Sequence, residues 1–281
     1  TSATAKLFLK SIKKYRLPII ISIVLAISSA ILGLFIPKIL GNVAAANIAI
    51  NYNIQGPSFT VSTACSSGGD AINTAAMCLK SGKADVMLAI GAESVLCPLV
   101  IYSLGNAKAL SRNNDNPQDA SRPFDKDRDG FVIGEGGGAL ILETEEHALK
   151  RGATIYAELL GCGNTCDAHH VTAPHPEGRG AADCMKLALE DAGITADKVG
   201  YINAHGTATN KGDFVESHSI KKIFGDNLPY VSSTKGATGH MMGAGGVTEV
   251  ITCIKALETG VIPPTINYET PDEECDLDYV P

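Results

Sequence analysis

One cysteine, two histidines and one lysine lie in short stretches of small residues, where a side chain can reach a substrate. Cys65 lies in Thr-Ala-Cys-Ser-Ser, and His205 opens His-Gly-Thr-Ala-Thr. Lys235 and His240 share one glycine-rich segment, five positions apart. A thiol can form a covalent thioester, while histidine and lysine can donate hydrogen bonds to developing negative charge. The set predicts covalent catalysis, and the alternative is that each residue is structural.

The residues around Cys65 predict a strand, a turn and a helix. β-Branched residues precede it from Val61, and from Ser66 to Lys80 apolar residues recur at helical spacing without a proline. The sulfur would then lie at a helix N-terminus, where unpaired N–H groups and the helix dipole favour a thiolate. This position predicts a nucleophile, with a buried structural cysteine as the alternative.

The rest of the chain predicts an α/β fold in which strands and helices alternate. The expected strands are 86–91, 138–142, 155–161, 200–203 and 230–233. The expected helices are 39–50, 66–80, 145–151, 180–192, 213–224 and 245–258. His205 and Lys235 each follow a strand closely, and α/β sheets place ligands and catalytic groups at strand ends.

Composition limits the class of protein. With 281 residues, 45% of them hydrophobic, the chain can bury a large core in one α/β domain or two smaller ones. The formal net charge is -7, and the only charges before Lys38 are four lysines and one arginine, so nothing indicates a nucleic-acid partner. The eight cysteines are scattered and predict reduced thiols in a cytoplasmic fold.

An uncharged stretch near the start predicts a membrane-spanning segment. Residues 17–36 carry no charge, and a helix needs about 20 such residues to cross a hydrocarbon core. The basic residues before it would lie on the cytoplasmic side. We therefore expect 1–36 to form an uncleaved membrane segment, with a buried core helix as the alternative. Residues 17–41 also resemble the first membrane helix of ABC exporters, but no phosphate-binding loop of a transport ATPase follows.

The stretches that contain Cys65, His205 and Lys235 to His240 resemble the signature motifs of β-ketoacyl-acyl-carrier-protein synthases, the condensing enzymes of fatty acid synthesis. The likeness runs from about Phe35 to Pro281 and includes Arg-Pro-Phe-Asp-Lys-Asp-Arg-Asp-Gly-Phe-Val and Ile-Pro-Pro-Thr-Ile-Asn. The Cys-His-His set resembles the elongating members, because the initiating members carry asparagine in place of the second histidine. The resemblance implies a thiolase-like layered α-β-α-β-α fold whose halves are residues 37–158 and 159–281.

The resemblance also implies roles for the reactive residues. Cys65 would accept the acyl chain as a thioester. His205 and His240 would hydrogen-bond the malonyl thioester carbonyl and stabilise the enolate left by decarboxylation. Lys235 would set the local field and orient the histidines, and Glu249 would support the site from the helix behind His240.

Substrate contacts and partners follow from the same resemblance. Thr207 and Thr209 match threonines that contact the pantetheine arm, and His170 and Thr172 belong to a substrate-entrance loop over residues 167–174. The chain would need no metal and no cofactor beyond the phosphopantetheine of its partner, acyl-carrier protein. We expect a homodimer in the cytoplasm, with membrane association if residues 17–36 insert.

Both ends depart from the family pattern. The family's opening strands and helices are absent before Phe35, and the chain stops at Pro281, before a glycine-phenylalanine-glycine loop that helps to form the oxyanion hole. We therefore expect a truncated fold, from a fragment or a fusion of two reading frames. The predicted activity is an elongating condensing enzyme. The alternatives are the ketosynthase domain of a polyketide synthase and a membrane-anchored fragment without activity.

Two stretches contain residues typical of metal sites. The loop from Asp125 to Gly130 opens like an EF-hand, but Gly136 stands where the bidentate glutamate belongs, so a tight acidic turn is predicted instead. The second stretch offers four soft ligands within nine residues, namely Cys162, Cys166, His169 and His170. The resemblance assigns part of it to the entrance loop, so zinc is the lesser interpretation.

Overall fold

The computed structural model describes residues 41–281, which divide into two compact units along the chain. The first unit ends at Thr60 and contributes α2 (Val43–Tyr52). Asn53 caps this helix, and its left-handed conformation (φ 53°) lets its N–H bond back to the last turn. The helix predicted at 39–50 is therefore observed a few residues further on.

The predicted membrane segment, residues 17–36, lies outside the described residues. Within residues 41–281 no helix is both long and apolar enough to cross a membrane. The longest helices there, α7 (Asn210–Phe224) and α9 (Gly245–Thr259), have 15 residues each, whereas a membrane-spanning helix needs about 20 apolar residues.

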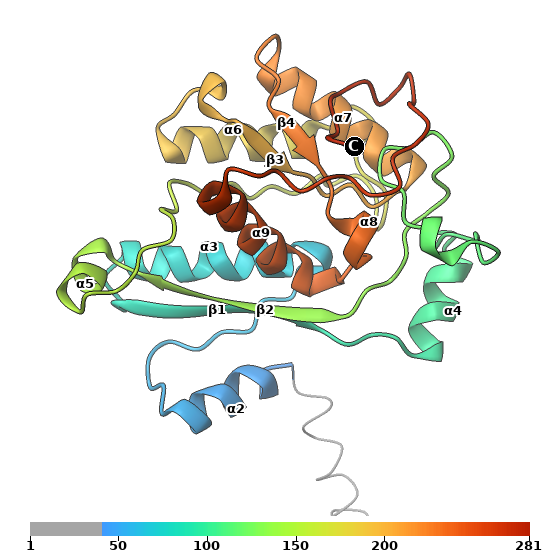
Figure 1. Cartoon of the computed structure of the whole chain (residues 1–281). Helices are drawn as coiled ribbons and strands as arrows, with labels where there is room; N and C mark the ends of the chain where they lie inside the picture. The colour runs from blue at the N-terminus through green and yellow to red at the C-terminus, as the bar shows by residue number, and fades with distance from the viewer. Residues whose placement is uncertain (1–40) are drawn as a thin grey trace, which may run out of the picture. The chain divides into compact units, whose positions relative to one another are not determined.

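The second unit contains two small sheets (Figure 1). β1 (Val86–Glu93) and β2 (Gly136–Glu143) pair antiparallel, with Val86 opposite Glu143. β3 (Tyr201–Asn203) and β4 (Tyr230–Ser232) pair in parallel. A parallel pair needs a crossover, and α7 supplies it, because it connects the end of β3 to the start of β4.

Helices cover these sheets in layers (Figure 1). α3 (Ser67–Lys80) and α9 lie together between the two sheets, where α3 packs on β1 and α9 contacts both β2 and β3. α6 (Arg179–Ala192) packs beside α7 on the outer face of β3 and β4. The order is sheet, helix pair, sheet, helix pair, which confirms the predicted α/β class.

Each helix pair has its own apolar core. Between the sheets, Ile72 and Ala75 of α3 meet Ala89 of β1 and Val247 of α9. The outer core is larger and includes three buried residues near the C-terminal end, Cys275, Leu277 and Tyr279. Its fully buried members include Phe124, Ile220, Val231 and Tyr279, and the rings of Phe124 and Tyr279 stack 4.1 Å apart.

A glycine fixes how closely α3 and α9 approach. A Cβ atom on Gly68 would lie 2.8 Å from the backbone N of Val247 and 2.9 Å from the carbonyl oxygen of Gly243. Real Cβ atoms do not come that close, so only glycine allows this contact. Because Cys65 precedes α3 and His240 precedes α9, the contact also sets how far apart these two residues lie.

Two predicted strands are wrong. Residues 155–161 and the β-branched run from Val61 have no ladder partner within the described part of the chain. Tyr156 and Leu160 are 62% and 47% exposed, so burial does not hold their segment in place either. A strand needs a hydrogen-bonded neighbour, and local β propensity cannot replace one.

The remaining helices include two that the sequence did not predict. These are α4 (Pro98–Asn106), which starts at a proline, and the four-residue α8 (Lys235–Thr238). α5 (Glu145–Lys150) was predicted to within one residue, and Thr144 caps it by accepting the N–H of His147.

Candidate active site

Cys65 lies in a single 3-10 turn, Ala64–Ser66, directly before α3. Ala64 holds a left-handed backbone conformation (φ 54°), which is costly for any residue with a Cβ. The Ser66 hydroxyl donates to Asp70 at 2.9 Å, which ties the turn to the first turn of the helix. The predicted turn-to-helix geometry is therefore present, without the strand expected before it.

His240 brings its ring to the Cys65 sulfur. Its Nε2 lies 2.9 Å from Sγ, and the residue is only 3% exposed. Its backbone is bridged to the segment before β2: the His240 N–H donates to Val132 at 2.7 Å, and the Gly134 N–H donates to His240 at 2.9 Å. These bonds hold the histidine in place from both sides.

His205 completes the cluster from the end of β3. Its ring centre lies 5.2 Å from that of His240, with the two planes almost perpendicular at 89°. The Cys65 sulfur and one ring nitrogen of each histidine all lie within 4.8 Å of one another. Three residues that are distant in sequence thus converge on one point, and part of the His205 residue stays exposed to solvent.

Glu216, which the sequence analysis did not single out, fixes the His205 loop. Its carboxylate accepts the backbone N–H of His205 at 2.7 Å and that of Gly206 at 2.8 Å. Burial raises the pKa of Glu216, and when its carboxylate is ionised both bonds are charge-assisted and stronger than ordinary backbone bonds. In the sequence, the only sign of this role was an acidic residue one turn into the helix predicted after the His205 motif.

Asp213, one turn earlier on α7, performs a similar task for two strained residues. It accepts the N–H groups of Phe124 at 2.8 Å and Ala208 at 3.1 Å, whose φ angles are 62° and 66°. The Arg128 guanidinium lies 3.8 Å away. Burial raises the pKa of Asp213 to about 7 despite these donors.

Lys235 and Glu249 form a buried ion pair beside the histidines. The Lys235 side chain is 3% exposed and that of Glu249 is 19% exposed. The ammonium comes from α8 and the carboxylate from α9, so the pair joins the two helices that flank His240. This placement agrees with the supporting roles expected for both residues, which stay predictions.

Both histidines are neutral at physiological pH. Desolvation is the main cause, and the positive charge of Lys235 acts in the same direction. Together they lower the pKa of His240 to about 4 and that of His205 well below its usual range. A neutral imidazole has one N–H and one free nitrogen, so each ring can donate one hydrogen bond to a substrate oxygen.

Burial favours the protonated form of the Cys65 thiol. Burial raises the pKa of the thiol, Lys235 and a backbone hydrogen bond lower it, and Glu249 and Glu93 raise it again, with a net rise. Burial thus opposes the thiolate that the helix N-terminus was expected to favour.

The four predicted substrate contacts lie in two loops. Thr207 and Thr209 belong to the His205 loop, with their hydroxyls 3.1 Å apart. His170 bonds within its own loop, where its Nδ1 accepts the backbone N–H groups of Thr172 at 3.1 Å and Ala173 at 3.2 Å. Their contact with substrate stays a prediction.

The first of the two stretches with metal-type residues has a structural role. The Asp125 carboxylate is buried, pairs with Arg122 at 3.0 Å and accepts the N–H groups of Glu269 and Thr270 at 2.7 Å each. It thus organises an acidic turn, as predicted. In the other stretch, the Cys162 N–H donates to the Asp191 side chain at 2.9 Å. All eight cysteines are free thiols.

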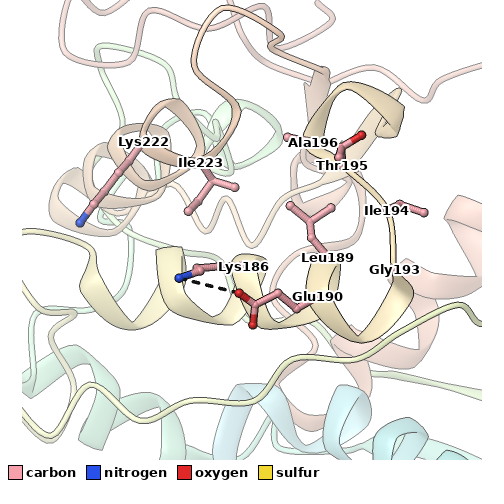
Figure 2. Close-up of a pocket in the computed structure, with 9 residues that line it drawn as sticks. All are labelled: Lys186, Leu189, Glu190, Gly193, Ile194, Thr195, Ala196, Lys222 and Ile223. Atoms are coloured by element: carbon pink, nitrogen blue, oxygen red, sulfur yellow. Dashed lines mark ion pairs between the residues drawn. The ribbon is translucent and has the colours of Figure 1, made fainter.

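A hollow of about 540 Å³ lies between α6 and α7, away from this cluster (Figure 2). Leu189 and Ile223 line it, and Lys186 forms an ion pair with Glu190 at its edge, at 3.7 Å. Its lining includes none of the predicted site residues. We therefore take the cluster of Cys65, His205 and His240, and not this hollow, as the candidate active site.

Comparison with known families identifies the class. Residues 27–148 match the family model for the β-ketoacyl synthase N-terminal domain, and residues 156–269 match the β-ketoacyl synthase C-terminal domain. This chain belongs to the β-ketoacyl synthase family. The first match begins inside residues 17–36, where the sequence predicted a membrane segment.

Two curated relatives are similar to most of this chain. A 3-oxoacyl-[acyl-carrier-protein] synthase 2 of Coxiella burnetii is 49% identical over 249 residues, which are 88% of this chain and 60% of that protein. The protein of the same name from Synechocystis is 48% identical with the same coverage. The chain thus spans about 60% of the length of the curated relatives it matches.

Solved structures confirm that the fold is that of ketosynthases. One is a type II polyketide acyl-carrier protein in complex with its ketosynthase bound to the hexaketide, with a TM-score of 0.83 and 43% identity over 85% of this chain and 60% of that chain. A β-ketoacyl synthase from Burkholderia phymatum has a TM-score of 0.80 and 39% identity, covering 85% of this chain and 58% of that one.

Proposed function

We propose that this chain carries the condensing site of a 3-oxoacyl-acyl-carrier-protein synthase that elongates fatty acids. The reaction would join an acyl thioester to a malonyl thioester with loss of carbon dioxide. The observation that supports it is the contact of 2.9 Å between Cys65 Sγ and His240 Nε2, with His205 beside them, in a chain 49% identical to a protein of that name.

The first step transfers the acyl group to Cys65. The sulfur attacks the carbonyl carbon of the acyl thioester, the bond from that carbon to the carrier's sulfur breaks, and the thiol proton ends on the departing thiol. Because burial raises the pKa of the Cys65 thiol, proton loss accompanies the attack. His240 in the tautomer with a proton on Nε2 donates to Sγ and stabilises the charge that develops there.

The second step forms the new carbon–carbon bond. The bond to the malonyl carboxylate breaks, carbon dioxide leaves, and the electron pair moves onto the thioester oxygen as an enolate. His205 and His240 donate hydrogen bonds to that oxygen. The enolate carbon attacks the acyl carbonyl on Cys65, the carbon–sulfur bond breaks, and the released thiolate takes a proton from solvent.

The Lys235 and Glu249 pair keeps the two histidines in the form that this step needs. Its ammonium lowers the pKa of each imidazole, so neither becomes a cation at neutral pH. Acyl-carrier protein would be the partner and its phosphopantetheine the carrier group. The homodimer and the cytoplasmic location expected from the sequence stay predictions.

A polyketide ketosynthase is the second candidate. The solved structure with a TM-score of 0.83 is a ketosynthase bound to a hexaketide, and the same two steps, repeated, would build such a chain. The number of condensations on one acyl group separates the candidates, since fatty acid elongation reduces the product before the next round.

Peptide mapping after incubation with acyl-acyl-carrier protein, followed by malonyl-acyl-carrier protein, tests the proposal. The acyl group should appear on Cys65 and then leave in a product longer by two carbons. Cys65→Ala should not be acylated, while Cys97→Ala, at an exposed thiol directly before α4, should behave as the parent chain. Repeated extension without reduction would favour the polyketide candidate, and absence of acylation would indicate an inactive chain.

A further inference from the structure

The same three residues have a second chemical property. A thiol and two imidazoles are the ligands that Zn²⁺ and Cd²⁺ prefer. We propose that Cys65, His205 and His240 form a reversible binding site for a thiophilic divalent metal ion such as Zn²⁺ or Cd²⁺, and that the bound ion blocks the cysteine.

The geometry needs little change to accept such an ion. In a tetrahedral zinc site, with Zn–S near 2.3 Å and Zn–N near 2.0 Å, the ligand atoms lie about 3.4–3.6 Å apart. Here Sγ and the His240 Nε2 are 2.9 Å apart, and all three ligand atoms lie within 4.8 Å of one another. Side-chain shifts of about 1 Å or less bring all three to zinc distance and leave the fourth position open to water.

The charges around the cluster do not prevent a cation from binding. Among residues 41–281, the cation beside the cluster is the Lys235 ammonium, which is paired with Glu249. Glu93 adds a second carboxylate on the side of the Cys65 turn, where it accepts the N–H of Gly243 at 3.2 Å. With Glu216 behind the His205 loop, the surroundings contain three carboxyl groups for one ammonium, which favours an added positive ion.

Metal binding and acylation would exclude each other. The thiol loses its proton to solvent when the metal–sulfur bond forms, and that sulfur lone pair is then not free to attack a carbonyl carbon. His240 would also have to bind through an unprotonated Nε2, which moves its proton to Nδ1. This inference goes beyond the proposed condensation and does not depend on it, since binding requires only the geometry.

Titration of the 281-residue chain with Cd²⁺ tests the site directly, through the ultraviolet absorption band of a cadmium–thiolate bond. One ion should bind per chain. Cys65→Ser should abolish the band, and His205→Ala and His240→Ala should each weaken binding by about 100-fold or more, since even lesser changes around a metal cost 10- to 100-fold. A control variant with Cys162→Ser and Cys166→Ser removes the two cysteines of the other stretch with metal-type residues and should bind as the parent does.

Zinc should also protect Cys65 from alkylation by iodoacetamide, as read by mass spectrometry of its peptide. A full cadmium band in Cys65→Ser, its loss in the Cys162 and Cys166 double variant, or alkylation of Cys65 unaffected by zinc would each overturn the proposal. Neither measurement involves condensation, so a chain that binds the ion but does not condense would contradict only the proposed function.

Discussion

Replacing Gly68 with alanine should force α3 and α9 apart, while the same change at the next residue should not. A Cβ at Gly68 meets two main-chain atoms of the α9 side at 2.8 and 2.9 Å, whereas a Cβ at Gly69 meets nothing within 4 Å. Both positions lie in the first turn of the same helix. Gly69→Ala is therefore a matched control for Gly68→Ala.

The size of the effect follows from these distances. Either change gains up to about 1 kcal/mol because alanine favours the helix over glycine. At residue 68 the contacts must lengthen from 2.8 Å to an ordinary 3.4 Å or more, and backbone atoms cannot rotate away as side chains can. Overpacking of this kind costs about 1–3 kcal/mol. The free energy of unfolding should therefore be about 1–3 kcal/mol lower in Gly68→Ala than in Gly69→Ala.

Urea unfolding of both variants measures this difference. The separation of the helices would also lengthen the contact between Cys65 and His240, so the rate of Cys65 acylation should fall in Gly68→Ala and hold in Gly69→Ala. Equal stability of the two variants, or a more stable Gly68→Ala, would show that the helices do not pack as closely as described.

Three further outcomes are expected. Glu216→Ala leaves two backbone N–H groups of the His205 loop without their acceptor. It should lower the free energy of unfolding, measured in urea, by about 1–3 kcal/mol for each group left buried, and it should slow decarboxylation. A variant as stable as the parent chain would contradict this prediction. His240→Ala removes one hydrogen-bond donor to the enolate and should slow malonyl decarboxylation, measured as carbon dioxide release, by about 10²–10³-fold. An unchanged rate would refute the proposed role of His240 as a donor to the enolate. The rate of Cys65 alkylation by iodoacetamide should still rise above about pH 8.5, because the thiolate reacts and burial raises the pKa of this thiol. Lys235→Met should shift this pH–rate profile to still higher pH, since the Lys235 charge lowers the pKa of the thiol. A rate that reaches its plateau below about pH 8 would contradict the prediction.

The positions of Cys65, His205 and His240 could be predicted because local sequence encodes them. Each lies in a turn of small residues next to a helix or after a strand, and the resemblance of these stretches to the family motifs supplied their expected roles. The helices around them, α3 and α9 above all, were predicted within a residue or two because their apolar residues repeat with helical period.

Other features depend on contacts that the sequence does not show. Whether residues 155–161 form a strand depends on a neighbour, which the described residues do not supply. The pKa of the Cys65 thiol also depends on burial, which raises it and which the sequence does not show. Glu216 looked like any acidic helix residue until the fold brought its carboxylate to the backbone of the His205 loop.

The distance along the chain between Cys65 and His240 has a consequence for how the protein is made. These residues are 175 positions apart. A ribosome adds about 5–20 residues per second, so the cysteine is synthesised roughly 9–35 s before its histidine partner. Throughout that time α3 has no α9 to pack against, and the thiol has neither imidazole beside it. A growing chain therefore carries an ordinary cysteine, and the reactive centre appears only after its last residue has been translated and folded into place.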